Sequence, residues 1–311
     1  MKKVGIIFPG QGSQYVGMGK SLYDSFDFVK GYYAAADAAL GFSMTDLCFK
    51  APEEELRQTY NTQPSLLLVC YTVWQVLKRE TGITPSFVAG HSLGEYTALL
   101  ASGFFTLEDA LVITRKRGLF MEEACPKGKG GMVALIGPDM TKVEVILQEI
   151  SHDDYVATPA NLNSAEQVVL SGDAQALKEA VEKLKGAYRK AVFLNVSGPF
   201  HSPLMKAAAE KLMIELTQIP RADMTTPVVF NVDATPGSEK DSVPDKLYRQ
   251  MFSPVLWEAS VKRMIGEGVE LFVEVGPQKV LTNLVKRIAP QIPCASVESL
   301  ADVETVKGLL V

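Results

Sequence analysis

The segment Gly90–Gly94 reads GHSLG, with SFVA at residues 86–89 before it and EYTALL at residues 95–100 after it. The residues before the segment predict a short apolar strand, and those after it predict the opening of a helix. A G-x-S-x-G pattern forms a nucleophile elbow where a strand turns sharply into a helix, with the serine at the tip. We therefore expect an α/β fold with the Ser92 hydroxyl exposed at such a turn. An ordinary glycine-rich turn is the alternative interpretation of the five residues alone.

A serine hydroxyl needs a base to take its proton, and the chain contains three histidines. His152 lies in the polar run SHDD, which is typical of a solvated loop. His91 is next to Ser92, and neighbours on a tight turn point their side chains apart, so a packing or hydrogen-bonding role suits it better. His201 lies in SGPFHSP at residues 197–203, where glycine and proline fix a loop ahead of a helical run. By elimination, His201 is the candidate base.

The composition is that of an ordinary globular protein, since 47% of the 311 residues are hydrophobic and 22% are charged. A formal net charge of −5 argues against general nucleic-acid binding, which needs a basic face. The four cysteines, at positions 48, 70, 125 and 294, lack C-x-x-C spacing, so we expect free thiols in a reducing compartment. The N-terminal apolar run is too short for a signal peptide, and no apolar stretch approaches the roughly 18 residues of a membrane span. We expect a cytoplasmic protein with no membrane contact.

Strand-like runs alternate with helical patterns along most of the chain, which favours a parallel sheet covered by helices on both faces. We expect a fold of the α/β class, with a large α/β-hydrolase-like domain built on a parallel sheet. The expected strands are Val4–Phe8, Phe87–Gly90, Val228–Asn231 and Leu271–Val275. The expected helices are Pro64–Glu80 (with Thr62 as its N-cap), Gly94–Ala101, Thr106–Glu123, Pro203–Gln218, Pro254–Glu267 and Lys279–Ile288.

The middle of the chain predicts a second, smaller domain. The glycine-rich run PKGKGG at residues 126–131 and SGP at residues 197–199 look like two joints. Between them, the expected elements are Met132–Ile136 (strand), Thr141–Ile150 (helix), Tyr155–Asn161 and Gln167–Gly172 (strands), Ala174–Lys185 (helix) and Ala191–Asn195 (strand). This β-α-β-β-α-β order is the ferredoxin-like plan. We therefore expect an inserted ferredoxin-like domain at 127–198, inside a large domain formed by 1–126 and 199–311, with the substrate cleft between them.

The run PGQGSQ at residues 9–14 follows the first strand and invites a phosphate-loop interpretation. The P-loop spacing fails because Gln14 stands where a glycine is required, and the dinucleotide pattern fails at Tyr15. Attack on a carbonyl instead needs preorganised N–H donors for the developing oxyanion. The Leu93 amide after the serine and the Gln11 amide are the candidate donors, with a plain tight turn as the alternative for the Gln11 loop.

The run Arg115-Lys116-Arg117 follows on the next predicted helix, and such runs are usually solvated. We expect that of Arg115 and Lys116, whereas a buried Arg117 would clamp a substrate carboxylate, because arginine binds carboxylates in a bidentate manner. No acid stands out as a third partner for serine and histidine. Asp233 and Glu274 are formally possible, and a backbone carbonyl would orient an imidazole equally well.

Taken together, these motifs resemble the malonyl-CoA:acyl carrier protein transacylase family over essentially the whole chain. The matching segments are FPGQGSQ at 8–14, TQP at 62–64, GHSLGEY at 90–96, RG at 117–118, GPFHS at 198–202, Gln250 ahead of PVLW at 254–257, and EVGP at 274–277. The resemblance implies that Ser92 is the acylated nucleophile and His201 its base. It implies further that the main-chain carbonyl of Gln250 orients His201.

The same resemblance assigns the remaining candidate residues. Gln11 and Leu93 would form the oxyanion hole, Arg117 would bind the malonyl carboxylate, and Gln63 and His91 would support the pocket. Phe200 matches the malonyl-type pattern, since methylmalonyl enzymes tend to have a smaller residue there. The implied reaction is ping-pong malonyl transfer from malonyl-CoA to the phosphopantetheine thiol of acyl carrier protein, without a metal or other cofactor.

Other functions stay open at this point. A serine hydrolase or thioesterase would use the same elbow but gives no reason for an arginine clamp. A noncatalytic synthase subunit would not need Ser92, His201 and Arg117 together. A freestanding acyltransferase of a polyketide or polyunsaturated fatty-acid pathway differs only in its carrier and acyl group. Because carrier proteins are acidic, docking needs a local basic patch, for which the candidates are Lys183, Lys185, Arg189, Lys190, Lys286 and Arg287.

Overall fold

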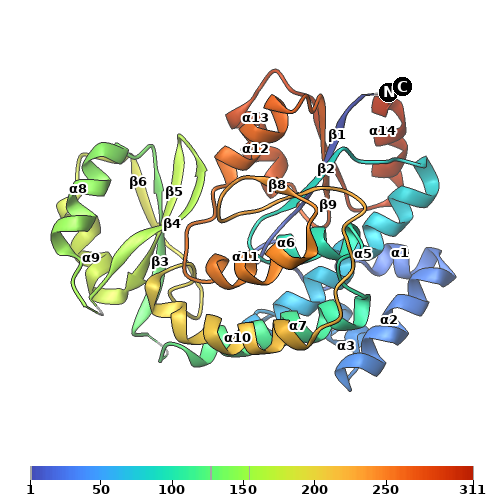
Figure 1. Ribbon diagram of the computed structural model, residues 1–311, viewed down its shortest axis with the longest axis horizontal. Helices are drawn as coiled ribbons and strands as arrows, with labels where there is room; N and C mark the ends of the chain where they lie inside the picture. Colours follow the sequence, from blue (N-terminus) through green and yellow to red (C-terminus); the bar gives the residue numbers. More distant parts are fainter. Residues whose placement is uncertain (1, 127, 154, 311) are drawn as a thin grey trace.

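The computed structural model describes residues 2–126, 128–153 and 155–310. The described chain forms two sheets, each with its own helices (Figure 1). The larger sheet has six strands in the order β10-β9-β1-β2-β7-β8, and the smaller has four in the order β4-β5-β3-β6. The predicted fold class, an α/β protein with a parallel core sheet and a small ferredoxin-like sheet, is confirmed.

Parallel pairing runs through the core of the larger sheet, where β1 lies between β2 and β9. Three of its strands, β1 (Val4–Phe8), β2 (Phe87–Gly90) and β9 (Leu271–Val275), have the predicted bounds. The sheet also contains β7 (Val228–Val229), β8 (Pro236–Gly237) and β10 (Cys294–Val297). The strand predicted at Val228–Asn231 ends two residues early, because the Phe230 amide turns to donate to the carbonyl of Thr235.

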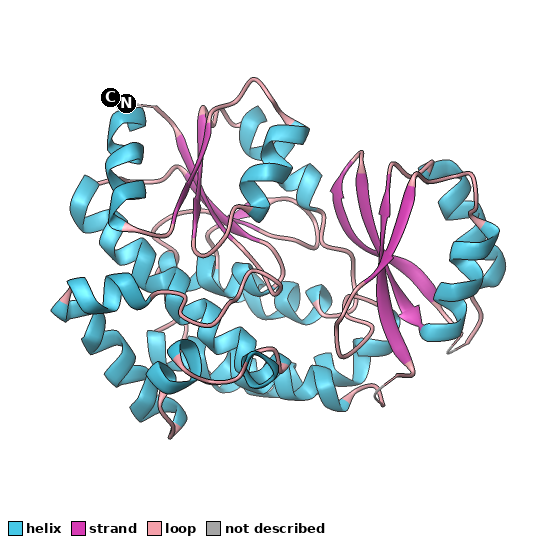
Figure 2. Cartoon of the chain, turned by 180° about the vertical axis from the view of Figure 1, so that it is seen from behind, coloured by secondary structure: helices cyan, strands magenta, loops and turns pink. Residues whose placement is uncertain are grey.

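Helices flank both faces of the larger sheet, and the chain termini lie side by side at one end of it (Figure 2). The N-terminal half supplies α1 (Lys20–Ser25), α2 (Asp27–Leu40), α3 (Met44–Phe49), α4 (Glu53–Leu56), α5 (Thr59–Thr81), α6 (Leu93–Ala101) and α7 (Leu107–Glu123). The C-terminal part supplies α10 (Lys206–Gln218), α11 (Val243–Gln250), α12 (Trp257–Gly266), α13 (Val280–Ile288) and α14 (Leu300–Leu310).

The long helix α5 differs from its prediction at the N-terminus. It begins at Thr59 and contains Pro64, so the predictions of a start at Pro64 and of Thr62 as N-cap are wrong. The Thr62 hydroxyl donates to the carbonyl of Leu56 instead. Proline has no N–H for the carbonyl four residues earlier, and Arg115 Nη1 donates to that oxygen of Tyr60 at 3.3 Å. A charged side chain from α7 thus makes an internal proline tolerable.

The smaller sheet follows the predicted element order. It consists of β3 (Gly130–Ile136), α8 (Met140–Ile150), β4 (Ala157–Ser164), β5 (Gln167–Asp173), α9 (Ala174–Lys183) and β6 (Lys190–Phe193), and all its strand pairs are antiparallel. Both helices lie on the side of the sheet away from the larger domain (Figure 1). The two joints meet, since a Cβ at Gly130 would touch the ring of Pro199. The predicted boundary falls at residue 127, outside the described residues, and the domain limits stay a prediction.

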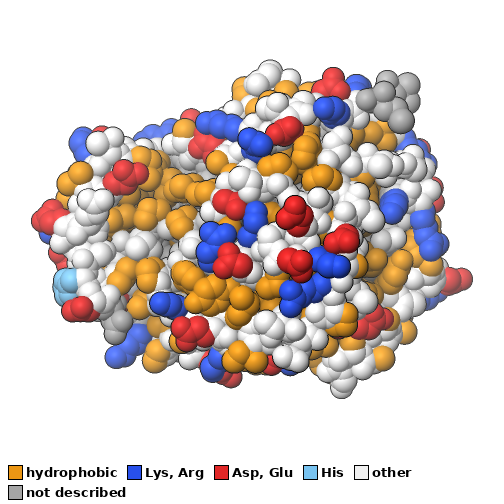
Figure 3. Space-filling view, in the orientation of Figure 1, with side chains coloured by type: hydrophobic (Ala, Val, Ile, Leu, Met, Phe, Trp, Pro, Cys, Tyr) orange, Lys and Arg blue, Asp and Glu red, His pale blue; other side chains and the backbone are white. Residues whose placement is uncertain are grey.

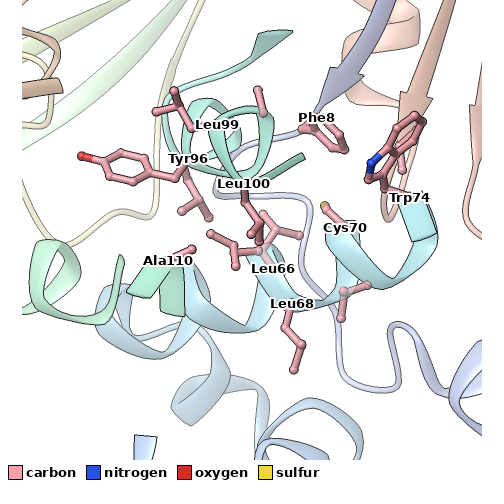
Figure 4. Packing of buried hydrophobic residues seen from close by; sticks show 14 of the residues in the cluster. Phe8, Leu66, Leu68, Cys70, Trp74, Tyr96, Leu99, Leu100 and Ala110 are labelled. Carbon is pink, nitrogen blue, oxygen red and sulfur yellow. The ribbon is translucent and has the colours of Figure 1, made fainter. Parts of the chain in front are cut away.

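The main core lies between α5, α6, α7 and the larger sheet. Figure 4 shows Leu66, Cys70 and Trp74 of α5 packing near Phe8 of β1 and near the side chains of α6. Burying apolar area at about 25 cal/mol per Å² is the main force that holds such layers together. The elbow residues are therefore supported by a well-packed hydrophobic core. All four cysteines are free, and Cys48, Cys70 and Cys125 are buried, as predicted. Among the described residues, no helix is long and apolar enough to cross a membrane.

Candidate active site

Ser92 lies at the tip of the turn between β2 and α6, with φ 51° and ψ −103°. A non-glycine residue rarely adopts a positive φ, and such strain persists only where the surroundings fix it. The glycines on either side permit the turn: a Cβ at Gly90 would overlap the backbone of Gly94, and one at Gly94 would overlap the carbonyl of Phe8. The predicted strand–serine–helix elbow is therefore present in the structure.

The imidazole of His201 connects Ser92 to Gln250. Ser92 Oγ lies 2.7 Å from His201 Nε2, and His201 Nδ1 lies 2.7 Å from the main-chain oxygen of Gln250. A carbonyl oxygen can only accept, so Nδ1 carries the proton and Nε2 is free to accept one from the serine hydroxyl. Burial, with the nearby positive charge of Arg117, lowers the pKa of His201 to about 3. The neutral form that a general base requires is thus the stable one.

Arg117 projects from α7 to the same point and is almost fully buried. Its Nη2 donates to Ser92 Oγ at 3.1 Å and to Gln250 Oε1 at 2.9 Å, and its Nη1 donates to Gln63 Oε1 at 2.8 Å. These acceptors are neutral, and Arg117 makes no ion pair with any described residue. Burial lowers the pKa of Arg117 from its usual value, but a guanidinium stays protonated in proteins. The site therefore holds an uncompensated positive charge beside the serine.

Gln63 and Gln250 fix the position of this guanidinium. Gln63 is fully buried on α5, and its Nε2 contacts the sulfur of Met121 at 3.4 Å. The Gln250 side chain also donates from Nε2 to the main-chain oxygen of Ser92 at 3.0 Å. Gln250 thus touches the base, the serine peptide and the arginine, whereas the resemblance implied only its main-chain contact.

The loop after β1 lies against the elbow because Gly10 has no side chain; a Cβ there would overlap the carbonyl of His91. Leu93 is the first residue of α6, and the first-turn amides of a helix have no partner within it. Within the described part of the chain, neither the Gln11 nor the Leu93 amide pairs with a protein acceptor. Both residues line the cavity beside Ser92. This placement suits the two predicted oxyanion donors.

The cavity beside Ser92 has a volume of about 100 Å³ and opens between the two sheets. Its walls are mostly apolar, and Arg117 is their only cationic residue among those that the structure describes. They include Phe200, Met121, Met132, Leu194 and Val196, together with Asn161 of β4. A short acyl group with a charged end fits this mixture of walls and a single cationic group. A larger hollow of about 740 Å³, near α3 and Arg115, includes none of the predicted site residues.

His91 makes no hydrogen bond to Ser92 or His201 among the described residues, although it lines the cavity beside the serine. Its Nε2 lies 2.9 Å from Asn163 Oδ1 of β4, and its ring packs against Trp257. Burial lowers its pKa. His91 therefore links the elbow to the small sheet.

Two predicted acid partners lie elsewhere. Glu274 accepts the amides of Leu281 and Thr282 at the start of α13, and Asp233 pairs with Lys246. Neither contacts His201, whose Nδ1 binds the carbonyl of Gln250 instead.

The expectation for the neighbours of Arg117 holds only in part. Lys116 pairs with Glu215 at the surface. Arg115 is partly buried over the rings of Phe42 and Tyr60, so the prediction of a solvated side chain is wrong for it. The reason is the free carbonyl of Tyr60, which Arg115 satisfies.

Several candidates for the basic patch are already paired with acids. Lys183 contacts Glu149 and Glu179, Lys185 contacts Glu182, and Arg189 contacts Glu166. Figure 3 likewise shows positive and negative side chains interspersed on one face of the molecule. These pairs weaken the case for the small domain as the basic patch, whose location stays a prediction.

Sequence reasoning missed two buried residues behind the serine. Asn231 donates from Nδ2 to the carbonyl of Gly90 and accepts from the Ser92 amide through Oδ1, each at 2.7 Å. Glu95, on the first turn of α6, accepts the Asn231 amide at 2.6 Å. An acid directly after a G-x-S-x-G motif was the available signal for Glu95, and Asn231 had none beyond its place after a strand.

A strand–serine–helix elbow, a histidine on the serine hydroxyl and unpaired amides beside it are the arrangement of serine-dependent acyl-transfer enzymes. The family model described as "Acyl transferase domain" matches residues 6–307. A malonyl CoA-acyl carrier protein transacylase of Bacillus subtilis (strain 168) is 43% identical over 308 residues, covering 99% of this chain and 96% of that protein. The chain belongs to the malonyl CoA-acyl carrier protein transacylase family and is an acyltransferase.

Solved structures agree with this assignment. The crystal structure of an acyl carrier protein S-malonyltransferase from Vibrio cholerae has a TM-score of 0.94 at 38% identity, covering 98% of this chain and 99% of that one. A malonyl-transacylase solved with its type II PKS acyl-carrier protein has a TM-score of 0.95 at 37% identity, covering 99% of each chain. The fold and the family resemblance predicted from the sequence are thus confirmed, while the roles of the individual site residues stay predictions.

Proposed function

We propose that this chain transfers the malonyl group of malonyl-CoA, through an ester on Ser92, to the phosphopantetheine thiol of an acyl carrier protein. The observation that carries the proposal is the buried guanidinium of Arg117, which lies 3.1 Å from Ser92 Oγ and has only neutral partners. A buried charge without a counterion is costly. A substrate carboxylate would supply the missing counterion next to the reacting atom.

The first half-reaction follows from the hydrogen bonds at Ser92. Nε2 of His201 takes the hydroxyl proton as Oγ attacks the thioester carbonyl carbon. The negative charge that develops on the carbonyl oxygen is stabilised by the amides of Gln11 and Leu93. The C–S bond then breaks, and CoA leaves as a thiol with the proton from His201. The Gln250 carbonyl holds the imidazole in the required tautomer and stabilises its positive form.

The second half-reaction reverses these steps with another thiol. The phosphopantetheine thiol gives its proton to His201, and its sulfur attacks the ester carbonyl of malonyl-Ser92. The Oγ leaves and recovers the proton from His201. Arg117 holds the malonyl carboxylate throughout, so the acyl group does not rotate away between the two acceptors. The Ser92 proton thus leaves with CoA in the first half-reaction, and the carrier thiol returns a proton to Ser92 in the second, both by way of His201. The covalent intermediate between the two halves makes the reaction ping-pong.

The proposed chemistry requires no metal or other cofactor, because the thioester is already activated and a thiol is a good leaving group. We place the reaction in the cytoplasm, where free thiols such as those of the buried cysteines are stable. Fatty-acid synthesis is the proposed pathway. The structural relative that binds a type II PKS carrier supports a second candidate, a polyketide carrier as the acceptor.

The proposal is tested by the intact mass of the protein after brief mixing with malonyl-CoA, with Ser92→Ala as the control. The expected result is a malonyl adduct on the wild type alone, which moves to a phosphopantetheinylated carrier added afterwards. Fatty-acid and polyketide carriers compared side by side would identify the acceptor class. Free malonate without transfer to either carrier would indicate a hydrolase, and no adduct would refute the malonyl assignment.

A further inference from the structure

Glu95 is a fully buried carboxyl group that the proposed mechanism does not use. It lies on the first turn of α6, three residues after Ser92. One oxygen, Oε2, accepts the main-chain amide of Asn231 at 2.6 Å. The other, Oε1, is buried and has no hydrogen-bond partner among the described residues. Burial of a carboxyl group is costly unless it is paired or neutral, so a group kept in this place calls for an explanation.

Asn231 carries the contact of Glu95 to the elbow. Its carboxamide bridges the two peptides on either side of His91, donating to the Gly90 carbonyl and accepting from the Ser92 amide. Its own carbonyl accepts the Leu256 amide at 2.9 Å. Asn231 therefore has partners at its main-chain amide, its main-chain carbonyl and both polar atoms of its side chain. Among the described residues, Glu95 is the only one of these partners that contributes a side chain.

These contacts act on the strained part of the turn. Ser92 has φ 51°, and an unfavourable conformation of this kind persists only when neighbouring groups fix it. The Ser92 peptide is held on one side by Asn231 and on the other by Gln250, whose Nε2 donates to the Ser92 carbonyl. Loss of one of these two hydrogen bonds would let Ser92 Oγ move away from His201 Nε2 while the helix and the strand remain folded.

We propose that Glu95 is a positioning residue for Ser92, acting through Asn231 to hold the serine peptide in its strained conformation. The inference rests on the proposed function only in naming Ser92 as the nucleophile. It requires an acceptor oxygen at Glu95 and not a negative charge. The carboxyl group therefore orients the serine without touching the substrate.

The surroundings of Glu95 favour its neutral form. Burial raises its pKa to about 8, against the opposing effects of the Asn231 amide, the Arg117 charge and the Gln250 side chain. The ionisable groups that face it are Arg117 of α7, Asp233 after β7 and its own neighbour Tyr96. A neutral Glu95 leaves the charge of Arg117 uncompensated. Positioning by a neutral acid thus preserves the cationic site for a carboxylate, which an ionised acid would weaken.

The test compares three variants with the wild type. Glu95→Leu removes the acceptor, Glu95→Gln keeps a neutral acceptor oxygen, and Asn231→Ala removes the bridging carboxamide but keeps the amide that Glu95 binds. The matched control is Glu274→Leu, which removes another fully buried carboxyl that accepts main-chain amides, at the start of α13. For each protein we would measure Tm, the rate of Ser92 labelling by a fluorophosphonate, and the KM and rate of acylation by malonyl-CoA.

We expect Glu95→Leu and Asn231→Ala to lower labelling and acylation by about 10-fold to 100-fold, the effect of a shift of about 1 Å in a reacting group. KM should change by less than about threefold, because Arg117 keeps its Gln63 contact. Glu95→Gln should recover the rate to within about threefold of the wild type. Glu274→Leu should lower Tm as much as Glu95→Leu but leave Ser92 labelling unchanged.

Two results would overturn the proposal. One is a rate of Ser92 labelling in folded Glu95→Leu that equals the rate in the wild type. If that variant does not fold, the same result in Asn231→Ala would overturn the proposal. The other is an equal loss in Glu95→Gln and Glu95→Leu, which would mean that charge and not the acceptor matters. The fluorophosphonate measures the reactivity of the Ser92 hydroxyl without any malonyl substrate. Failure of malonyl-CoA to acylate the wild type would therefore refute the proposed function and leave this test intact.

Discussion

Arg117 donates a hydrogen bond to Ser92, with 3.1 Å between Nη2 and Oγ. One buried guanidinium thus lies within contact distance of the hydroxyl, and its remaining partners are the side-chain oxygens of Gln63 and Gln250. The distance between the serine and the cation fixes how long an acid can be and still reach both. A short dicarboxylic thioester meets that requirement, and the cavity beside the serine is small, at about 100 Å³.

Replacing Arg117 by Met should therefore change acyl selectivity. Removing one partner of a buried, hydrogen-bonded ion pair costs about 2–5 kcal/mol, so kcat/KM for malonyl-CoA should fall at least about 30-fold. Acetyl-CoA lacks the carboxylate and should lose less than about threefold. The measurement is acyl-enzyme formation with both thioesters in parallel. Equal losses for the two would show that Arg117 supports the fold of the site and does not recognise the carboxylate.

The acylation rate should begin to fall at a much lower pH than it would with a histidine of ordinary pKa as the base. Burial lowers the pKa of His201 to about 3, so its neutral form persists as the pH falls. We expect the acylation rate constant to stay level down to about pH 5, where a base with the ordinary pKa of about 6.5 would have lost most of its activity. Rapid-quench mass measurements between pH 5 and 8 would test this, and a half-maximal rate near pH 6.5 would contradict it.

The same depressed pKa affects stability. Between its folded value of about 3 and the unfolded value near 6.5, the unfolded chain binds a proton at His201 that the folded chain does not. The stabilising contribution is present above pH 6.5 and is lost as the pH falls. In His201→Asn, the slope of the free energy of unfolding against pH over this window should decrease by the amount that corresponds to one bound proton. An unchanged slope in urea titrations would refute this assignment.

Much of the fold could be predicted because strands of a parallel sheet are buried on both faces and form continuous apolar runs. The predicted bounds of Val4–Phe8, Phe87–Gly90 and Leu271–Val275 match for that reason. The helices between Lys20 and Leu56 were not predicted, although α2 buries Val29, Tyr33 and Ala36 at helical spacing. The start of α5 was wrong because Arg115, distant in sequence, makes Pro64 acceptable inside the helix.

Some residues of the candidate site could likewise be predicted from local sequence, whereas others are brought together only by the tertiary fold. The elbow and the His201 loop have local signatures in glycine and proline, so both could be found from the sequence. Glu95 and Asn231 are 136 residues apart, and their contact depends on β7 lying beside β2. Gln250 was found only through the resemblance, because a main-chain carbonyl has no sequence signature. Its side-chain contacts to Arg117 and Ser92 follow from the tertiary fold alone.

Those side-chain contacts make Gln250→Glu informative. A carboxylate at this position would pair with Arg117 Nη2 and compete with the substrate carboxylate, while the main-chain contact to His201 would remain. The donor to the Ser92 carbonyl would be lost, which lowers the rate with both thioesters alike and leaves KM as the quantity to compare. We expect KM for malonyl-CoA to rise more than about tenfold, equivalent to about 1.4 kcal/mol. The KM for acetyl-CoA should change much less, which is the internal control. A rise of similar size for both thioesters would mean that the substitution distorts the cavity.

The final prediction concerns alkaline pH. Glu95 has a pKa of about 8 and is neutral below it. Relative to an unfolded value near 4.5, this raised pKa gives a stabilising contribution that is lost as the pH rises through 8. Ionised Glu95 would also partly neutralise the positive charge of Arg117, which weakens binding of the substrate carboxylate. We therefore expect KM for malonyl-CoA to increase several-fold between about pH 7.5 and 9.

Glu95→Gln removes the titrating group but keeps its acceptor oxygen, so the increase in KM should disappear in that variant. Acetyl-CoA serves as the second control, because a neutral acyl group does not compete for the charge of Arg117. The deciding measurement is KM for both thioesters across this pH range in the two proteins. An identical rise in wild type and Glu95→Gln would assign the effect to another group and refute this prediction.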